Sequence, residues 1–315
     1  MNKNILIIGS GVLGAYLSNF LISKKFNIYV TTRKLKNKYQ NYQKLEIQKK
    51  VNFIKLDVFK KKDIDITLKK IKPAHIYYFA GVSSITESFK KPKETMISNY
   101  LGAKNFLEII YKKKINTKFY KANSGYIFDG KGKKINSDSK LIKHNSPYTN
   151  SQIKSFKLVN EYRKKNLNCS NLIFFNIESP LRPDDFLIKK ICKSIKLIKK
   201  NKVKNLKVGN IDCIRDFSWA PEIVKAIYFF SKLKPQNIVL GTGREMSIRY
   251  ILKTLFKLNK LDYRDYIEID KNLFRKNEQP KITCSVNKTV LLLKRFNWKP
   301  KIFGNKLLIK LYNNS

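Results

Sequence analysis

The chain has 315 residues, 43% of them hydrophobic, which is enough to bury one large core or two modest ones. Its formal net charge is +45, but lysine supplies nearly all of the excess and is spread along the whole chain. Because the lysines form no basic tail and accompany no zinc-finger spacing, we expect nonspecific attraction to polyanions and no specific nucleic-acid partner.

Short apolar strands alternate with amphipathic helices from the first residues onward. The predicted strands are Asn4–Ile8, Ile28–Thr31, Val51–Leu56, Ile76–Phe79, Lys118–Ala122 and Leu172–Phe175. The predicted helices are Gly11–Ser23, Thr95–Tyr111 and the segment that Ser146, Pro147 and Tyr148 open. This βαβ order predicts an α/β fold, a Rossmann-type doubly wound parallel sheet with helices on both faces and ligands at the carboxyl ends of its strands.

The pattern changes after Pro180. The predicted elements there are the helices Phe186–Lys200, Pro221–Ser231, Ser247–Leu258 and Asn287–Phe296 and the strands Leu206–Gly209 and Ile238–Gly241. We interpret them as a smaller C-terminal lobe. The predicted division assigns residues 1–175 to the Rossmann domain, with 211–240 returning to it, and 176–210 and 241–315 to the lobe. Lysine runs such as Lys60–Lys62 and Lys112–Lys114 are expected on solvated faces or loops.

The four cysteines, Cys169, Cys192, Cys213 and Cys284, are far apart in the chain and show no CxxC spacing. A disulfide framework or a metal site is therefore not expected, and the thiols should be buried as small apolar groups. No run of residues is long and apolar enough to span a bilayer. We therefore expect a soluble, cytoplasmic protein without membrane insertion.

A glycine motif of the form GxGxxG follows the first strand and opens the first helix. Gly9 allows a tight turn, Gly11 lets the backbone approach a pyrophosphate, and Gly14 permits close contact between helix and strand. Together with Val12 and Leu13, these glycines form a predicted dinucleotide-binding turn.

The ends of the second and third strands favour one form of the cofactor. Thr31–Lys34 lacks the Asp or Glu that usually bonds a ribose 2′-hydroxyl, and Arg33 can pair with a 2′-phosphate instead. This favours NADP, with NAD possible, although Arg33 can also be one more surface cation of a basic chain. Asp57 and Val58 are predicted at the adenine edge, where Asp57 can equally cap a turn.

Small residues end the fourth strand. Ala80 and Gly81 let the chain pass close to a dinucleotide, and Asn99 in the following helix is included among the predicted cofactor contacts. Ser83 belongs to a stretch that can line a sugar pocket. Ser124 ends the fifth strand, where it can bond a substrate oxygen or serve only as a turn residue.

Tyr148 is the predicted general acid or base. An ordinary tyrosine titrates near pH 10 and needs a neighbouring positive charge to act at neutral pH. A lysine four residues later would share its helical face, but that position is Gln152, which can bond a ribose and carries no charge. Lys154 is six residues on and points away. The oxidised nicotinamide's own charge gives partial help; otherwise the site is silent.

Two groups of cations suit a diphosphate substrate. Lys189 and Lys190 lie on the helix that begins at Phe186, and the scarcer Arg215 and Arg275 lie in turns, the latter three residues before Glu278. Arginine is the better bidentate phosphate ligand, so these two positions are the more informative.

Taken together, these residues resemble the extended short-chain dehydrogenase/reductases, the NAD-dependent epimerase/dehydratase family that modifies nucleotide sugars. The resemblance covers nearly the whole chain, and its downstream half is most similar to the GDP-mannose 4,6-dehydratases. The segments that carry it are His144–Tyr148, Phe175–Arg182, Val208–Phe217, Phe274–Glu278 and Phe296–Pro300. The resemblance implies tightly bound, recycled NADP, and a nucleotide diphosphate held by Asn176, Lys190, Arg215 and Arg275. Ser83, Glu178, Lys189 and Glu278 complete the predicted substrate contacts.

The resemblance also implies a mechanism: C4 of the hexose is oxidised, a glutamate removes the C5 proton as water leaves C6, and the hydride returns to C6. The family's Ser-Thr-Ser-Glu motif corresponds here to residues 123–126, where Ser124 can replace the threonine and Tyr126 stands where the glutamate should be. Residues 123–130 are instead similar to a segment of dTDP-4-dehydrorhamnose reductases.

Three predictions follow from these departures: a GDP-hexose 4,6-dehydratase first, a 4-keto-sugar reductase or epimerase second, and a catalytically silent NADP- or nucleotide-sugar-binding homologue third. Gln152 counts against both enzymes because both families use the Tyr-x-x-x-Lys pair. The resemblance further implies a homodimer or homotetramer formed through the Thr95–Tyr111 and Tyr148 helices.

Overall fold

The computed structural model describes residues 3–35, 39–143, 146–274 and 278–315. The chain divides into two compact units. The first consists of Met1–Phe128, Ser137–Phe174 and Val224–Val239, and the second of Asp129–Asn136, Phe175–Ile223 and Leu240–Ser315.

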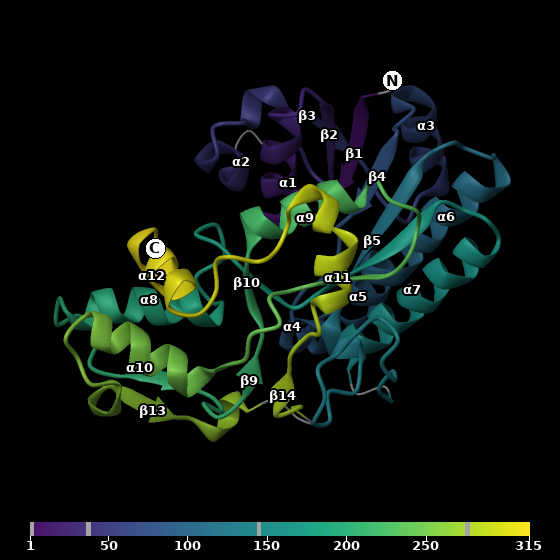
Figure 1. Ribbon diagram of the computed structural model, residues 1–315. Helices are drawn as coiled ribbons and strands as arrows, with labels where there is room; N and C mark the ends of the chain where they lie inside the picture. Colours follow the sequence, from purple (N-terminus) through teal and green to yellow (C-terminus); the bar gives the residue numbers. More distant parts are fainter. Residues whose placement is uncertain (1–2, 36–38, 144–145, 275–277) are drawn as a thin grey trace. The chain divides into compact units, whose positions relative to one another are not determined.

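A seven-stranded parallel sheet forms the centre of the first unit, with the strand order β11-β6-β5-β4-β1-β2-β3 (Figure 1). The strands are β1 (Asn4–Ile8), β2 (Asn27–Thr32), β3 (Asn52–Lys55), β4 (His75–Tyr78), β5 (Lys118–Ser124), β6 (Cys169–Phe174) and β11 (Ile238–Leu240). The order reverses between β1 and β4, which creates the switch point where doubly wound sheets bind ligands. The predicted fold class is confirmed.

Helices cover both faces of this sheet. On one face, α3 (Lys61–Ile71), α6 (Gly102–Lys112) and α7 (Pro147–Lys164) share a buried apolar cluster with β1, β4 and β5. The other face carries α1 (Val12–Ile22) and the part of α9 (Ala220–Phe230) that follows Val224. There the rings of Phe20 and Tyr228 lie 5.4 Å apart, and Phe230 packs on Tyr120 of the sheet.

Shorter elements join these layers. They are α2 (Gln40–Lys44), α4 (Ile85–Lys90), α5 (Pro92–Met96), the π-helix η2 (Ile97–Leu101) and the 3₁₀ turns η1 (Gln48–Lys50) and η3 (Gly125–Ile127). The predicted helix over Thr95–Tyr111 is present without a break, but its hydrogen-bonding pattern changes from α5 to a π-helix and then to α6.

The helix α3 was not predicted from the sequence. Its first residues lie in the lysine run Lys60–Lys62. Its buried apolar residues Ile64, Leu68 and Ile71 repeat every three or four positions, but charged residues occupy three of the five positions between them, and the exposed Ile66 blurs the pattern. The apolar stripe is therefore narrow, and the lysine run at the start of the segment obscures it.

The described residues of the second unit form three small sheets. In these, β7 (Asn176–Glu178) pairs with β10 (Phe217–Trp219), β9 (Ile214–Arg215) lies between β12 (Met246–Ser247) and β14 (Lys281–Ile282), and β8 (Leu206–Val208) pairs with β13 (Ile267–Ile269). The other elements are α8 (Leu187–Ile198), α10 (Ile248–Leu258), α11 (Asn287–Leu292), α12 (Gly304–Asn313), η4 (Tyr263–Asp265), η5 (Lys271–Leu273) and η6 (Lys294–Phe296). An apolar cluster of its own unites α8, α10 and α12.

The two units differ from the predicted division by one residue at Phe175 and more substantially in two places. The segment that returns to the first unit is Val224–Val239 and not 211–240, because β9 and β10 pair with strands of the second unit. Residues 129–136 join the second unit, where Ile135 bridges Cys284 and the Lys134 ammonium donates to the Gly243 carbonyl at 2.7 Å.

All four cysteines are free and buried, as predicted. Within the described part of the chain, no cluster of three or more His, Cys, Asp or Glu side chains is arranged to hold a metal ion. None of the helices formed by the described residues combines the length and apolar character that crossing a bilayer requires.

Candidate active site

The register of the first unit's sheet aligns the strand ends that carry the predicted cofactor contacts. Ile8 of β1 pairs with Thr31 of β2 on one side and with Tyr78 of β4 on the other. The ends of β1, β2 and β4 therefore lie side by side, and the glycine turn, Arg33 and Ala80 follow them at one edge of the sheet. These are the positions that a dinucleotide lying across the switch point would touch.

The glycine turn has the geometry that the motif predicts. Gly9 adopts a φ of +107°, and a Cβ there would lie 3.0 Å from the backbone nitrogen of Ala80. A Cβ on Gly14 would lie 2.6 Å from the carbonyl oxygen of Gly9, so the first turn of α1 packs directly on the loop. These two glycines are required by the protein's own packing.

Gly11 has a different role. Its φ is −75°, and a Cβ built on it meets nothing within 4 Å, so the fold itself does not require a glycine there. It caps α1, whose first turn has neither a side-chain cap nor an acidic residue. Backbone N–H groups at such an end are suited to a phosphate. The turn, including Val12 and Leu13, thus fits a dinucleotide.

Asn99 connects two parts of the candidate site. It lies on the π-helix η2, and a Cβ on Gly81 would come within 1.9 Å of its Oδ1. Its Nδ2 donates to the Val82 carbonyl at 3.2 Å and to the Ser151 hydroxyl at 3.1 Å. Asn99 therefore holds the loop after β4 against α7, and Gly81 is required by this close contact.

The start of α7 fixes Tyr148 at the second helical position. Ser146 and Thr149 form a capping box around Pro147, and the backbone nitrogen of Tyr148 donates to the Ser88 hydroxyl at 3.2 Å. One turn later, the Ser151 hydroxyl donates to the Tyr148 carbonyl at 2.7 Å. The tyrosine is consequently held by its backbone from two elements, and its side chain is largely buried.

Gln152 lies one helical turn after Tyr148 and is buried. Its Oε1 accepts no hydrogen bond from any described residue. An unsatisfied buried acceptor at this position suits a ribose hydroxyl, which supports the fit to a dinucleotide. The ammonium of Lys154 lies 5.9 Å from the ring centre of Tyr100, so it is directed at another residue.

Ser124 ends β5, as predicted, and its hydroxyl accepts a hydrogen bond from the backbone nitrogen of Tyr126 at 3.2 Å. Tyr126 belongs to the 3₁₀ turn η3 that follows. The hydrogen bonds that support Ser124 could not be predicted from the sequence. Asn123 donates to the Asn171 amide oxygen at 2.6 Å and accepts from the Ser155 hydroxyl at 3.1 Å, and this ties the end of β5 to α7.

The remaining predicted contacts of the first unit lie in turns. Asp57 accepts from the backbone nitrogen of Phe59 at 3.0 Å, which is the turn-capping alternative, and Val58 packs at Gly102. Ser83 is exposed and precedes Ser84, the N-cap of α4. The guanidinium of Arg33 donates to Glu94 at 2.6 Å. The backbone of Ala80 packs against Gly9.

In the second unit, two predicted substrate contacts bind each other. Arg215 on β9 lies 3.0 Å from the Glu278 carboxylate, and its guanidinium also donates to the carbonyls of Ile214 and Pro280. The Arg215 side chain is 5% exposed and that of Glu278 is 18% exposed. Arg275 lies outside the described residues.

Other predicted contacts of this unit are also engaged by the protein. Asn176 donates its amide to the Asp216 carbonyl at 3.1 Å, Lys190 donates to the Lys207 carbonyl at 2.8 Å, and Lys189 donates to the Pro180 carbonyl at 3.3 Å. Glu178 is buried on β7, and burial raises the pKa of its carboxyl to about 7, although the nearby Arg182 charge lowers it.

Asp216 is a buried residue whose role sequence reasoning missed. Its carboxylate accepts hydrogen bonds from the backbone nitrogen and hydroxyl of Thr242, from the backbone nitrogen of Gly243 and from the Cys284 thiol. These partners are 26 to 68 positions away in the chain. The aspartate follows Arg215 directly and therefore fixes the strand that presents the arginine.

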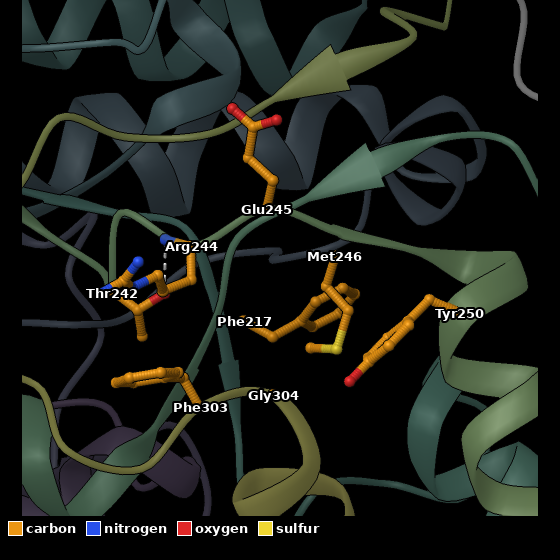
Figure 2. A pocket seen from close by; sticks show the side chains of 8 residues that line it. All are labelled: Phe217, Thr242, Arg244, Glu245, Met246, Tyr250, Phe303 and Gly304. Carbon is orange, nitrogen blue, oxygen red and sulfur yellow. Dashed lines mark hydrogen bonds between the residues drawn. The ribbon is translucent and has the colours of Figure 1, made fainter.

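The second unit also contains a cavity of about 200 Å³, smaller than the usual small-molecule pocket. It is lined by Phe217, Thr242, Arg244, Glu245, Met246, Tyr250, Phe303 and Gly304. Figure 2 shows Phe217 between the Arg244–Phe303 side and the Met246–Tyr250 side, with Glu245 pointing away. Among the described residues, none of the predicted substrate contacts lines this cavity.

The switch-point sheet, the glycine turn and the tyrosine at the start of α7 are together typical of the extended short-chain dehydrogenase/reductase class. The family model described as GDP-mannose 4,6 dehydratase matches residues 6–310, and the chain belongs to this family. The family prediction is thereby confirmed.

Known proteins agree with this assignment. The GDP-mannose 4,6 dehydratase 1 of Arabidopsis thaliana is 30% identical over 322 residues, which cover 97% of this chain and 88% of that protein. A GDP-mannose 4,6-dehydratase of Vibrio cholerae is 25% identical over 264 residues, or 80% of this chain and 71% of that protein. These relatives are enzymes.

Solved structures share the fold at lower identity. The UDP-glucuronic acid 4-epimerase from Bacillus cereus, in complex with UDP-glucuronic acid and NAD, has a TM-score of 0.84 and 19% identity over 99% of this chain and 98% of that one. The dTDP-glucose 4,6-dehydratase from Bacillus anthracis, in complex with NAD, has a TM-score of 0.82 and 17% identity over 99% and 96%.

Proposed function

We propose that the protein is an NADP-dependent nucleotide-sugar 4,6-dehydratase that acts on a GDP-hexose such as GDP-mannose. The observation that carries this proposal is the family match over residues 6–310, which includes both the dinucleotide turn and the substrate segments of the second unit. The first unit would bind the dinucleotide, and the second would bind the nucleotide diphosphate through Asn176, Lys190, Arg215 and Arg275.

The dinucleotide, when bound, supplies the acceptor and later the donor of a hydride. The chain's own residues bind and orient it. The uncapped start of α1 behind Gly11 receives the pyrophosphate, Gln152 accepts a hydrogen bond from a ribose hydroxyl, and Arg33 receives a 2′-phosphate. NAD remains a second cofactor in this proposal, because the likeness to NAD complexes extends to the whole fold.

Tyr148 moves the proton of the sugar hydroxyl, and Ser124 orients that oxygen. Without a lysine at position 152, the positive charge that favours the phenolate must come from the bound oxidised cofactor. We therefore expect turnover that increases toward alkaline pH.

The base for the elimination step needs a different position, because Tyr126 stands where the family motif has glutamate. Glu178 is our candidate. Its buried carboxyl, with a pKa of about 7, has the acidity that suits a general base near neutral pH. Glu178→Gln should abolish loss of water and leave dinucleotide binding unchanged, a difference that equilibrium binding and product analysis can separate.

The decisive experiment incubates the purified protein with NADP and GDP-mannose and analyses the sugar nucleotide by mass spectrometry. Loss of one water, absent with Tyr148→Phe, would support the dehydratase. Unchanged GDP-mannose in the presence of bound NADP would remove this sugar as the substrate.

A 4-keto-sugar reductase or epimerase is the second candidate, and Tyr126 in place of the glutamate is the observation that favours it. It predicts oxidation of NADPH when a nucleotide 4-keto-sugar is added, or inversion at C4, in each case without loss of water. A protein that binds dinucleotide and never turns over would instead be the silent homologue that Gln152 allows.

The same resemblance supports a homodimer or homotetramer. We expect the purified protein to have at least twice the mass of the chain in light scattering. A monomer at micromolar concentration would contradict this part of the proposal.

A further inference from the structure

Arg33, the predicted contact of a 2′-phosphate, holds a carboxylate of the protein. Its Nη1 donates to Oε1 of Glu94 at 2.6 Å. Arg33 follows β2, whereas Glu94 lies on α5, 61 positions later in the chain. The fold therefore brings the two residues together, and the local sequence around either one does not predict the pair.

The ion pair is exposed and can be exchanged for another partner. The side chains of Arg33 and Glu94 are 74% and 36% exposed, and such surface pairs contribute little to stability. The turn that presents Arg33 is fixed without Glu94, because the Thr32 hydroxyl donates to the Lys34 carbonyl at 3.0 Å. A stronger ligand of the guanidinium can consequently replace the carboxylate without disturbing the loop.

A carboxylate at this end of the second strand has a known chemical meaning. In dinucleotide sites that prefer NAD, an Asp or Glu there accepts a hydrogen bond from the ribose 2′-hydroxyl. Thr31–Lys34 contains no acid, but Glu94 brings a carboxylate to Arg33 from another element. A 2′-phosphate must displace this carboxylate and then remain near its negative charge, whereas a 2′-hydroxyl can donate to it.

We propose that Glu94 is a cofactor-specificity residue, whose carboxylate competes with a 2′-phosphate for Arg33 and so allows the site to accept NAD as well as NADP. This inference rests on the proposed function only in that the site must bind a nicotinamide dinucleotide. It assigns to one side chain the balance between the two cofactors.

The test measures the Kd of NADP and of NAD by calorimetry at one ionic strength, using the full chain and the variants Glu94→Gln, Arg33→Ala and the double variant. Glu94→Gln should tighten NADP binding about three- to tenfold and leave NAD binding the same or weaker. In the Arg33→Ala background, Glu94→Gln should increase NADP affinity less, because no guanidinium remains for which the Glu94 carboxylate and the 2′-phosphate could compete.

Glu268→Gln is the matched control. It also removes one negative charge from an exposed glutamate paired with a cation, here Lys207 at 3.3 Å in the second unit. If Glu268→Gln tightened NADP as much as Glu94→Gln does, the effect would be one of net charge and the inference would fail.

The remaining outcomes separate the inference from the function on which it rests. NADP binding that Glu94→Gln leaves unchanged, or NAD binding that tightens in parallel, would overturn the role of Glu94 and leave the dinucleotide site intact. Failure of every variant to bind either dinucleotide would overturn the proposed function together with the inference.

Discussion

The two units bury a cation under opposite conditions. In the first, the ammonium of Lys121 donates to the Ala122 carbonyl at 2.5 Å, lies 5.3 Å from the ring centre of Tyr78 and forms no ion pair with a described residue. In the second, the buried guanidinium of Arg215 pairs with Glu278 and donates to two carbonyls. Burial accordingly lowers the pKa of Lys121 to about 7.

The candidate-site residues repeat this contrast. In the first unit, Gln152 Oε1 and Asn99 Oδ1 are buried without a hydrogen-bond donor among the described residues, and α1 begins without a side-chain cap. In the second unit, Arg215 and Asn176 are satisfied by the protein itself. A ligand that reaches Gln152, Asn99 or the start of α1 therefore adds hydrogen bonds that the fold lacks, whereas a ligand of Arg215 or Asn176 must exchange partners, as must a ligand of Arg33.

Replacing Lys121 with methionine should give the largest change in stability. The pKa of this lysine is about 7 in the folded chain against 10.5 when exposed, so the unfolded state binds more protons between these pH values. Wild-type stability should rise with pH through that window. Lys121→Met should remove the slope and raise the free energy of unfolding by as much as about 5 kcal/mol below pH 7.

Urea unfolding at pH 6 and pH 9 measures this effect, and Lys55→Met on the exposed edge of β3 is the control. A gain that is equal at both pH values would show that Lys121 is not the titrating group.

The same change at the buried cation of the second unit should have the opposite sign. Arg215→Met leaves the Glu278 carboxylate without its partner, and we expect a loss of about 3 to 5 kcal/mol in the free energy of unfolding. Adding Glu278→Gln should recover part of this loss. Denaturation of the single and double variants measures both effects; additive losses would mean that the two side chains do not depend on each other.

The glycine turn allows packing and binding to be separated. Gly14→Ala places a Cβ 2.6 Å from the Gly9 carbonyl oxygen and should cost about 2 kcal/mol of stability, because backbone must move. Gly11→Ala meets open space, so it should leave the melting temperature unchanged while dinucleotide affinity falls about tenfold. Equal melting temperatures for the two variants would contradict the packing argument.

The smallest expected effect concerns Gln152. Gln152→Lys would place an ammonium one helical turn after Tyr148 and favour the phenolate, so activity at pH 7 should rise about tenfold and the pH optimum should fall. The pH profile of turnover measures this effect. Lys157→Gln on the exposed face of α7 is the control, because Ser151 contacts Asn99 and cannot serve. An unchanged profile would contradict the role given to position 152, and absence of turnover in both proteins would support the silent homologue.

The sequence predicted the sheet of the first unit well because its strands are short apolar runs between turns. The prediction for β1 matches the structure, and the glycine spacing announced the turn that follows it. The helix α3 was not predicted because its apolar stripe is narrow. The π-helix around Asn99 was not predicted because hydrophobic periodicity does not distinguish it from an α-helix.

Partners that are distant in the chain set the limit of prediction at the candidate site. Glu94 reaches Arg33, and Glu278 reaches Arg215, only because strands and helices bring them together, and Asp216 gathers its donors in the same way. Single-residue roles were accessible where a motif imposes them locally. Whether a cation is available to a ligand depends on these long-range partners, which no spacing in the sequence reveals.

The four buried thiols can be used to measure how often each unit unfolds locally. Cys169 belongs to the first unit and Cys192, Cys213 and Cys284 to the second, and burial raises the pKa of each thiol above its ordinary value. An alkylating reagent can therefore modify them only when the surrounding unit opens. Mass-resolved labelling of the native protein would yield an opening rate for each unit separately, and a dinucleotide should slow the modification of Cys169 first.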